Sequence, residues 1–460
     1  MTAIAVIGGG ITGLAAAYEL AINAPSDVSV LLLEASDRLG GKVRTDVVNG
    51  LLVEAGPDSF LVREPWVKEL CAELGLGDDL VAPAVFGAAI LHRGRLRRLP
   101  EGFAYGMPSA PLAALKTGLL SPLGALRATA DLVLPGPLRG PDVSIGAFVR
   151  RRFGNEVLER LVDPLLAGTR AGDPDHLSLQ AAVAPIDELA RRHRSLIVGL
   201  RAARRVGELE TGPPPFLGIR GGVQRLTDAV ARALTPRVEI HVGMPVTSVR
   251  SAQNGFALTT TDGKIEASGL VVSVPAFAAA PVIEALSADA ARELRAIDHA
   301  SVAVVTIVYP SGSFHVPEGV SGLLVPRSEN TTIAACTFYD AKWPNAAPKD
   351  GRRIVRAVVG RAGRDPALDL GDDDLTARVH ADLRGALGVA AEPSFSHVVR
   401  WERGLAQYAV GHLDRVARIE RDLSSWPTVA LPGSGYRGSG LPDCIRQGRE
   451  AARRVLGALP

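Results

Sequence analysis

A glycine-rich segment near the N-terminus carries the clearest chemical signature of the sequence. Gly8, Gly10 and Gly13 follow the short apolar run Ile4–Ile7 and precede the helical stretch Leu14–Ala21. The first glycine permits a tight turn, the second lets the backbone approach a pyrophosphate, and the third lets helix and strand pack closely. The N-terminus of the helix then faces the phosphate charge. The pattern therefore predicts a dinucleotide-binding site.

A second apolar run completes this unit. Val28–Leu33 ends at Glu34, and a carboxylate at this distance from the glycines can accept hydrogen bonds from ribose hydroxyls. Short, fully apolar strands that alternate with a helix indicate a parallel sheet that is buried on both faces. We expect an α/β fold that opens with a Rossmann-like dinucleotide-binding domain.

Length and composition limit the function classes. A chain of 460 residues is expected to form two or more domains, and 47% hydrophobic with 22% charged residues is typical of a globular protein. The net charge of +2 argues against a nucleic-acid-binding protein, which carries a clustered basic excess. Cys71, Cys336 and Cys444 lie too far apart for a disulfide framework or a CxxC metal site. We expect no bound metal and a reducing, cytoplasmic environment.

Two regions bear on membrane contact. The N-terminus leads straight into an apolar strand, without the basic region and cleavage site of a signal peptide. The apolar stretch Pro111–Leu138 is interrupted by charges, prolines and glycines, whereas a membrane span needs about 20 predominantly apolar residues. Two alternatives stay open for Gly102–Leu138: the segment docks on the surface of a bilayer, or it covers a substrate cavity. Contact with the inner face of the cell membrane is expected to be peripheral at most.

Further along the chain the pattern changes from helix to strand. A helix is predicted at Trp66–Leu74 and a helical region at Ser144–Arg205, followed by the break Gly212–Pro215. Beyond the break, apolar alternation predicts strands at Val238–Val242, Val246–Val249, Phe256–Thr260, Leu270–Val274, Val302–Val308, Leu323–Val325, Ile333–Phe338 and Ile354–Val359. A helix follows at Leu375–Leu387, and the last strand and helix are expected at Val429–Leu431 and Cys444–Leu456.

A second motif follows Glu34 directly. The residues from Glu34 to Thr45 fit the pattern E-x-x-x-R-x-G-G-K-x-x-T. This extension resembles that of FAD-dependent, amine-oxidase-like flavoproteins and separates them from nicotinamide dehydrogenases. Gly40 and Gly41 would allow the backbone to approach the FAD pyrophosphate, while Arg38 could supply positive charge.

Longer segments narrow the resemblance. They are Val53–Phe60, Leu431–Ile445, Pro164–Ser178, Gly322–Pro326, Ala335–Pro344, and Gln407–His412 after Trp401. Over essentially its whole length the chain resembles the HemY-type porphyrinogen oxidases. The resemblance implies an α/β (α+β) architecture, with a Rossmann-like FAD domain, a substrate domain with a mixed sheet, and a helical subdomain. It implies FAD-binding parts at 1–75, 213–280 and 396–460, a substrate and helical, membrane-like domain at 76–212, and the sheet of the substrate domain at 281–395.

The resemblance also implies the cofactor site. The AMP end would involve Gly8, Gly9, Gly10, Ile11, Thr12, Gly13, Glu34 and Ala35, and the backbone of Val246 would contact adenine. The pyrophosphate and flavin would be lined by Gly41, Lys42, Gly56, Pro57, Asp58 and Ser59. Trp401, Ser439, Gly440 and Leu441 would lie near the isoalloxazine. FAD is expected to be non-covalent, because the setting of Cys444 is unlike the covalent attachment motif.

The implied reaction is the oxygen-dependent, six-electron oxidation of coproporphyrinogen III to coproporphyrin III in haem biosynthesis. Three hydride transfers to flavin N5 would release hydrogen peroxide, with no catalytic side chain needed. Plant and animal relatives carry a propionate-binding Arg where this chain has Ala88, and Arg170 replaces a common Tyr. Because coproporphyrinogen has four propionates, Arg63 and Arg170 are candidate substrate contacts, together with Leu324.

Three alternatives stay open at this point. The same mechanism serves protoporphyrinogen IX oxidases, an amine-oxidase-type flavoenzyme is a second class, and a non-catalytic flavin or porphyrin carrier is a third. Hand-over of the product to a downstream chelatase would follow from the proposed place in haem biosynthesis. His176 and His412 are interpreted as structural, hydrogen-bonded residues.

Overall fold

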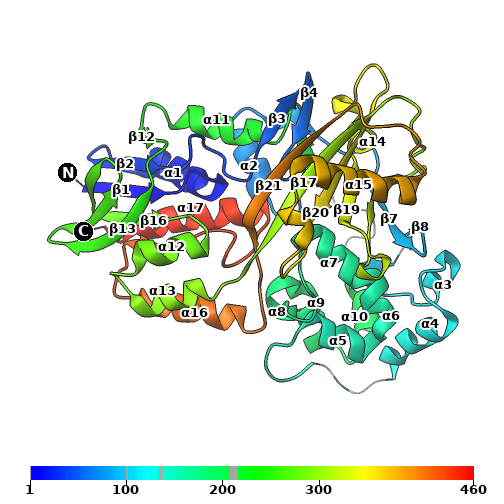
Figure 1. Cartoon of the computed structure of the whole chain (residues 1–460). Helices are drawn as coiled ribbons and strands as arrows, with labels where there is room; N and C mark the ends of the chain where they lie inside the picture. The colour runs from blue at the N-terminus through cyan, green and yellow to red at the C-terminus, as the bar shows by residue number, and fades with distance from the viewer. Residues whose placement is uncertain (1, 100–101, 134–135, 137, 208–215, 460) are drawn as a thin grey trace. The chain divides into compact units, whose positions relative to one another are not determined.

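The computed structural model describes residues 2–99, 102–133, 136, 138–207 and 216–459, which form two compact units (Figure 1). The first unit contains three segments, Met1–Ala82, Pro215–Asp298 and His412–Pro460. The second contains two, Pro83–Pro214 and His299–Gly411.

These segments differ from the predicted boundaries after residues 75, 212, 280 and 395. Residues 281–298 lie in the first unit, because helices α12 (Ala276–Ile283) and α13 (Ala288–Arg295) pack on each other and α13 packs on α16 (His412–Asp422). The functional roles assigned to the segments stay a prediction.

A five-stranded parallel sheet forms the centre of the first unit. Its strands lie in the order β12, β2, β1, β16 and β22, which span Val238–His241, Val28–Leu33, Thr2–Ile7, Gly269–Val272 and Val429–Ala430. In β1 every residue after Thr2 is buried, as expected for a parallel strand that is covered on both faces. The parallel sheet predicted from the apolar runs is confirmed.

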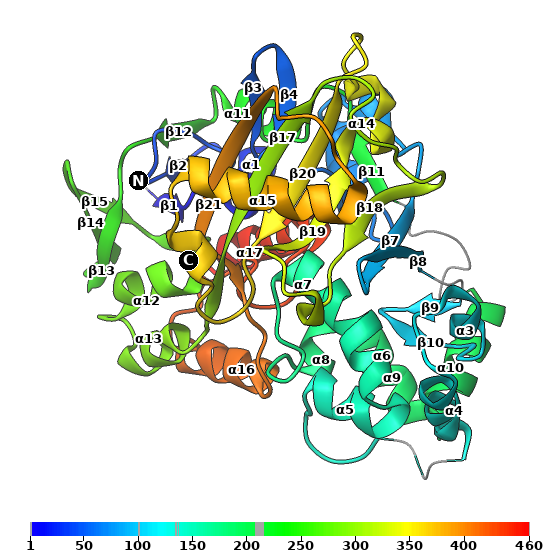
Figure 2. The same ribbon diagram turned by 45° about the vertical axis from the view of Figure 1, so that its right-hand side comes forward.

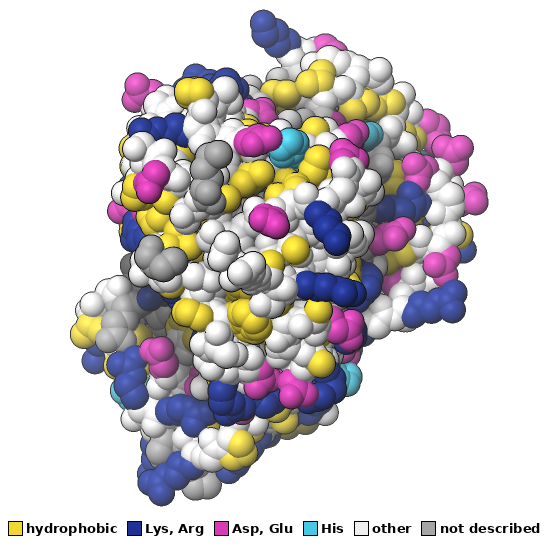
Figure 3. Space-filling view, turned by 90° about the vertical axis from the view of Figure 1, so that its left-hand side faces the viewer, with side chains coloured by type: hydrophobic (Ala, Val, Ile, Leu, Met, Phe, Trp, Pro, Cys, Tyr) yellow, Lys and Arg dark blue, Asp and Glu magenta, His cyan; other side chains and the backbone are white. Residues whose placement is uncertain are grey.

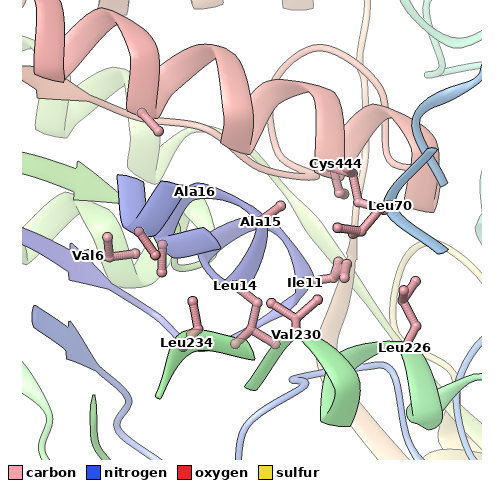
Figure 4. Close-up of a cluster of buried hydrophobic side chains, with 14 of the residues drawn as sticks. Val6, Ile11, Leu14, Ala15, Ala16, Leu70, Leu226, Val230, Leu234 and Cys444 are labelled. Carbon is pink, nitrogen blue, oxygen red and sulfur yellow. The ribbon is translucent and has the colours of Figure 1, made fainter. Parts of the chain in front are cut away.

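Three long helices pack with this sheet: α1 (Ile11–Asn23), α11 (Gln224–Leu234) and α17 (Leu441–Gly457). Their apolar side chains join those of β1 and of α2 (Trp66–Glu73) in one buried cluster (Figure 4). The shorter strands of this unit are β3 (Thr45–Val48), β4 (Leu51–Glu54), β5 (Phe60–Leu61), β6 (Leu80–Val81), β11 (Phe216–Ile219), β13 (Val246–Ala252), β14 (Gly255–Thr260) and β15 (Gly263–Ala267).

Helices α1 and α17 run in the same direction. A side chain at Gly448 would collide with the carbonyl of Thr12 near the start of α1, so the two helices approach closely there. Further along both helices, Arg453 donates to Glu19 at 2.6 Å. The N-termini of α1 and α17 therefore lie at the same end of the unit.

A seven-stranded mixed sheet forms the second unit's framework. Its strands lie in the order β21, β17, β20, β19, β18, β7 and β8, which span Phe395–Ala406, His299–Tyr309, Arg353–Val359, Ile333–Phe338, Val320–Leu324, Gly87–His92 and Arg95–Arg98. Residues 396–411, predicted to begin the last FAD-binding part, lie in this unit because β21 pairs with β17 along its length. Helix α15 (Asp372–Leu387) covers one face of the sheet (Figure 2).

A group of helices with its own apolar core completes the second unit. The helices are α3 (Ala113–Thr117), α4 (Pro122–Thr129), α5 (Ile145–Phe153), α6 (Asn155–Val157), α7 (Asp163–Arg170), α8 (Leu179–Ala182), α9 (Ala184–Arg192) and α10 (Leu196–Arg205). The short strands β9 (Phe103–Ala104) and β10 (Met107–Pro108) pair with each other, and helix α14 (Tyr339–Lys342) lies beside the sheet. The region predicted as helical is divided, since Gly154 and Ala171 adopt positive φ angles of 90° and 49°.

Among the described residues, no helix combines the length and the apolar character that crossing a membrane requires. Basic and acidic side chains are interspersed on the face shown in Figure 3, in keeping with 51 basic and 49 acidic residues in the sequence.

Candidate functional site

The glycine-rich turn lies at the carboxyl end of the central strand β1. Gly8 donates to the carbonyl of Leu33 at the end of β2, and Leu14 donates to the carbonyl of Gly10 to begin α1. Strand β1 lies between β2 and β16, which come from different parts of the chain. In open α/β sheets, ligands bind outside the carboxyl ends of strands at such a switch point.

Two glycines of the turn have opposite surroundings. A Cβ atom at Gly13 would collide with the carbonyl oxygen of Gly8, so Gly13 is required for packing of α1 on the turn. A Cβ atom at Gly10 would meet no atom within 4 Å. The space in front of Gly10, at the start of α1, is therefore open to a ligand, and the exposed backbone N–H groups of the first helical turn favour an anion there.

The carboxylate of Glu34 holds the turn in place. Its Oε2 accepts a hydrogen bond from Gly9 N at 2.5 Å, and its Oε1 accepts from the backbone and hydroxyl of Ser36 at 2.8 and 2.7 Å. Ala35, beside it, is exposed. A carboxylate has acceptor capacity beyond these three bonds, so Glu34 can also accept from a ribose hydroxyl.

The segment after Glu34 returns to the glycine turn. Gly40 donates to the carbonyl of Gly9 at 2.8 Å, and Gly41 lies against Gly10. Lys42 lies near Cys444 at the start of α17, and the Cys444 thiol is hydrogen-bonded to Thr12. Burial lowers the pKa of Lys42. The ammonium group thus lies beside the first turns of both α1 and α17.

The third chain segment contributes the start of α17. Gly440 is its N-cap residue, preceded by Ser439 and followed by Leu441, and Gly440 N donates to Asp443 at 3.3 Å. Since α1 and α17 run in the same direction, Ser439, Gly440 and Leu441 lie at the same end of the unit as Gly10. Two helix N-termini and the half-buried Lys42 ammonium group together form a site suited to a diphosphate.

The middle segment lies beside Glu34. Met244 N donates to the carbonyl of Glu34 at 2.8 Å, which places the half-buried Val246 at the edge of this site. Gly56 lies against the carbonyl of Lys42, and it is followed by Pro57, Asp58 and Ser59, whose side chains are all half-buried. The structure thus gathers the predicted cofactor residues of the first unit at one end of the sheet, with Ile11 and Thr12 buried in the first turn of α1.

Ser273 is a residue of this site that the sequence did not single out. Its hydroxyl donates to the carbonyls of Ile7 at 3.0 Å and Gly8 at 2.9 Å, so it fastens the glycine turn to the end of β16. A polar residue directly after a buried parallel strand is the signal that could have identified it, because such strand ends meet at the same edge of the sheet.

The other residues predicted to contact the substrate or the flavin lie in the second unit, except for Arg63. Leu324 lies at the end of β18 against Gly168 of α7, and the half-buried Arg170 ends that helix. The Arg170 guanidinium stands 5.9 Å from the ring centroid of Tyr408. Trp401, on β21, packs against a small cluster with Ala171, Ala300 and Val302. Arg63 is exposed and belongs to the first unit.

The three cysteines and His412 are buried, whereas His176 is exposed and its Nδ1 atom lies 3.5 Å from the Asp173 carboxylate. Cys71, Cys336 and Cys444 are buried thiols, and burial raises the pKa of Cys444 to about 11, which keeps it protonated at neutral pH. His412 is buried, with its Nε2 atom 2.9 Å from the Tyr436 carbonyl, as predicted for a hydrogen-bonded histidine. In the part of the chain that the structure describes, no three His, Cys, Asp or Glu side chains converge as a metal site would require.

Comparisons with known proteins agree with this geometry. Residues 11–456 match the family model described as flavin containing amine oxidoreductase. Coproporphyrinogen III oxidase of Bacillus subtilis (strain 168) is 35% identical over 98% of this chain and 97% of its own, and that of Staphylococcus aureus is 31% identical over 99% of both.

The solved structures extend the likeness to the fold. A protein from Exiguobacterium sp. 255-15, provisionally named a protoporphyrinogen oxidase, has a TM-score of 0.87 at 32% identity over 99% of this chain and 98% of its own. Wild-type putrescine oxidase bound to putrescine has a TM-score of 0.69 at 19% identity, over 99% of each chain, a likeness of fold alone.

Proposed function

Because the chain belongs to the flavin-containing amine oxidoreductase family and is an FAD-dependent oxidoreductase, we propose that it oxidises coproporphyrinogen III to coproporphyrin III. The main support for this substrate is the full-length similarity to bacterial coproporphyrinogen III oxidases. The match covers 97% of the Bacillus subtilis protein and 99% of the Staphylococcus aureus protein. Protoporphyrinogen IX is the alternative substrate, because a chloroplastic protoporphyrinogen oxidase of Arabidopsis thaliana is 29% identical over 98% of this chain.

The first unit's residues fit a dinucleotide. The space in front of Gly10 can take a diphosphate, and any larger side chain at this position would fill that space. The N-termini of α1 and α17 and the Lys42 ammonium supply positive charge for the diphosphate. Glu34 would accept from the ribose of the AMP half. Bound FAD would supply the redox chemistry, accepting a hydride from each of three meso carbons and passing the electrons to oxygen with release of hydrogen peroxide.

The protein's own task is therefore to bind and orient the substrate and to exclude water. None of its side chains needs to act as an acid or base. In the second unit, Leu324 and Trp401 offer apolar surface to the macrocycle, and Arg170 offers a planar cation to a propionate. Arg63 stays a second candidate for a propionate contact.

The test is spectroscopic. Anaerobic addition of coproporphyrinogen III should bleach the flavin absorbance in proportion to the substrate added, and air should restore it with formation of hydrogen peroxide. A flavin that stays oxidised would favour the carrier hypothesis. Steady-state turnover of coproporphyrinogen and protoporphyrinogen then decides the substrate, and a clear preference for protoporphyrinogen overturns the proposal. Flavin that stays attached to acid-precipitated, boiled protein would contradict non-covalent binding.

We also propose that the protein is cytoplasmic and binds peripherally to the inner face of the cell membrane. The support is an exposed apolar surface on α3 and α4, where Leu112, Leu123 and Leu126 are 60%, 79% and 65% exposed. The exposed cations Lys116 and Arg127 lie on the same helices, which suits an anionic bilayer. From there the product would pass to a downstream chelatase.

Co-sedimentation with vesicles tests the membrane contact. We expect binding to phosphatidylglycerol vesicles and weaker binding to phosphatidylcholine, with loss of binding in the double variant Leu123→Gln, Leu126→Gln. The matched control is Val47→Gln, which changes an exposed apolar residue of the first unit. Equal binding of all three proteins to both vesicle types would contradict a bilayer site on α3 and α4.

A further inference from the structure

Helix α7 lies on one face of the sheet of the second unit. The other face carries the large apolar core that the sheet shares with α15. A Cβ atom at Gly168 of α7 would lie 2.9 Å from side-chain atoms of Leu324 and Ala335, so the helix touches β18 and β19 there. The helix ends at Arg170. The position of its last turn therefore decides where the Arg170 guanidinium lies.

The residue that follows α7 has a left-handed backbone conformation. Ala171 adopts φ and ψ angles of 49° and 28°, and its N–H donates to the carbonyl of Ala167 at 3.0 Å. Glycine usually occupies such a position after a helix, because a side chain is strained there. Ala171 is 1% exposed and packs in a cluster with Val358 and Trp401. Strained turns of this kind persist where the surrounding structure holds them, and they gather at binding sites.

The side chain of Gln407 holds this turn from the end of β21. Its Nε2 atom donates to the carbonyl of Arg170 at 3.0 Å and to the carbonyl of Leu405 at 3.1 Å. Both neighbours are acceptors, so the amide nitrogen and not the amide oxygen faces them. The carbonyls of the last helical turn have no partner within the helix, and this side chain satisfies one of them. Gln407 thus ties the end of α7 to an edge strand of the sheet.

Two further contacts fix the same turn. Ala362, which follows β20, donates from its backbone N–H to the carbonyl of Ala171 at 2.5 Å. Tyr408 is buried, and its ring centroid lies 5.9 Å from the Arg170 guanidinium. Arg170 is therefore held at two points, at its carbonyl by Gln407 and at its side chain by Tyr408.

The arrangement lowers the stability of the fold in two ways. The Gln407 Oε1 atom is buried and accepts no hydrogen bond from any residue that the structure describes. A buried acceptor without a partner is destabilising, and so is an alanine in the left-handed region. A glycine after α7 would relieve the strain at Ala171. Proteins accept such losses of stability where function needs a fixed geometry.

We infer that Gln407 is a positioning residue for substrate binding: by fixing the carbonyl of Arg170, it fixes the direction in which the guanidinium meets a propionate of the porphyrinogen. The inference rests on the proposed function. Gln407 acts through Arg170 and not by touching the substrate. Its loss therefore cannot weaken substrate binding more than the loss of the Arg170 guanidinium does, whereas a purely structural role carries no such limit.

A double-mutant cycle on Arg170→Ala and Gln407→Met tests this dependence. Gln407→Met keeps the length of the side chain and removes both N–H donors. It should raise KM for coproporphyrinogen about 2- to 10-fold with kcat within about 2-fold, because the hydrogen bonds that orient the arginine are lost. In the Arg170→Ala background, the same change should raise KM no further.

The control is Asn23→Leu in the first unit. Asn23 Nδ2 donates to the carbonyl of Glu19 at 2.9 Å, so it is also an amide side chain that satisfies a carbonyl at the end of a helix. Asn23→Leu should leave KM unchanged, whatever its effect on Tm. Affinity for coproporphyrin, followed by porphyrin fluorescence, should fall about 2- to 10-fold in Gln407→Met, while affinity for coproporphyrin tetramethyl ester should stay at the wild-type value.

Gln407→Glu adds a pH-dependent readout. A protonated carboxyl group can donate one hydrogen bond to the Arg170 carbonyl, whereas the ionised group can donate none. KM of this variant, divided by that of the wild type at the same pH, should therefore be lowest at acidic pH and rise as the introduced carboxyl group ionises. The same ratio for Gln407→Met should not depend on pH.

Three outcomes overturn the inference: a wild-type KM in either single variant, a further rise of KM when Gln407→Met is added to Arg170→Ala, or equal losses of affinity for coproporphyrin and its ester. Failure of the proposed function has a different signature, because the wild-type protein would then leave coproporphyrinogen unoxidised.

Discussion

In the first unit, the groups that face an anion are backbone N–H groups at the starts of α1 and α17, with Lys42 beside them. In the second unit, the proposed group is the guanidinium of Arg170, at the end of a helix. A site made of backbone is destroyed by added volume, because a new side chain fills the space that the ligand needs. A site made of side chains tolerates volume but depends on charge. Substitutions in the two units should therefore fail in different ways.

The largest effects are expected at the glycine turn. Gly13→Val should destabilise the folded protein by about 3 kcal/mol or more, since its side chain would collide with the Gly8 carbonyl. Gly10→Val should fold with a stability within about 1 kcal/mol of the wild-type apoprotein, because its side chain meets open space, and yet retain no FAD. Thermal unfolding of the apoproteins and flavin absorbance after gel filtration measure the two effects.

The two variants distinguish a glycine needed for packing of α1 on the turn, Gly13, from a glycine needed to leave room for the ligand, Gly10. A yellow, fully loaded Gly10→Val protein would contradict a diphosphate in front of Gly10. An apoprotein of Gly13→Val that is as stable as the wild type would show that the turn can move away from α1.

The next effect concerns Lys42. Because burial lowers its pKa, the unfolded chain binds this proton more tightly than the folded apoprotein does. Stability of the apoprotein should therefore rise as pH increases from the folded-state pKa towards the usual value of about 10.4. Lys42→Met should remove this rise and weaken FAD by about 3 kcal/mol, the upper range for a charged hydrogen bond.

The control is Lys68→Met, which removes an exposed ammonium from α2 of the same unit. It should change neither the pH dependence of unfolding nor the FAD affinity. If the stability of Lys42→Met still rises with pH over this range, the rise belongs to another group.

A smaller loss is expected at Glu34. Glu34→Ala should weaken FAD by about 1.5–3 kcal/mol, because it removes an acceptor for the ribose and also the bond that holds Gly9. Glu34→Gln keeps one acceptor oxygen and should lose less. Titration of the apoproteins with FAD measures both values, and an unchanged affinity in Glu34→Ala would place the ribose elsewhere.

The difference between the units also decides what the sequence could predict. The glycine turn, Glu34 and Lys42 lie close together in the chain, and their spacing alone predicts a dinucleotide site. Val246 could be added only through the resemblance to a family. Ser273 depends on the pairing of β16 with β1, two strands that lie far apart in the sequence, and a shift of one residue would turn its side chain to the other face.

Strand β21 shows the same limit. Its sequence from Phe395 to Ala406 carries His397, Arg400, Glu402 and Arg403, so its apolar content is too low to predict a strand. It forms because β17, almost wholly buried, offers a full edge of backbone hydrogen-bonding groups. Tertiary pairing, which the local sequence does not encode, decides this element and with it the position of Trp401.

The smallest expected effect belongs to Arg170, at the end of α7. Its guanidinium lies 5.9 Å from the Tyr408 ring centroid, and its backbone carbonyl accepts from Gln407 at 3.0 Å, so the residue is held in place before any substrate binds. Arg170→Ala should raise KM for coproporphyrinogen about 2-fold if the propionate pair is open to water and about 10-fold if it is shielded, with little change in kcat. The effect should shrink with added salt if the pair is open.

Two comparisons make this prediction specific to charge. Arg170→Lys keeps the positive charge and should recover part of the loss, though not the bidentate geometry. Protoporphyrinogen has two propionates fewer, so it should be affected less if Arg170 meets one of the extra pair. Wild-type kinetics with both substrates would contradict a propionate contact of Arg170.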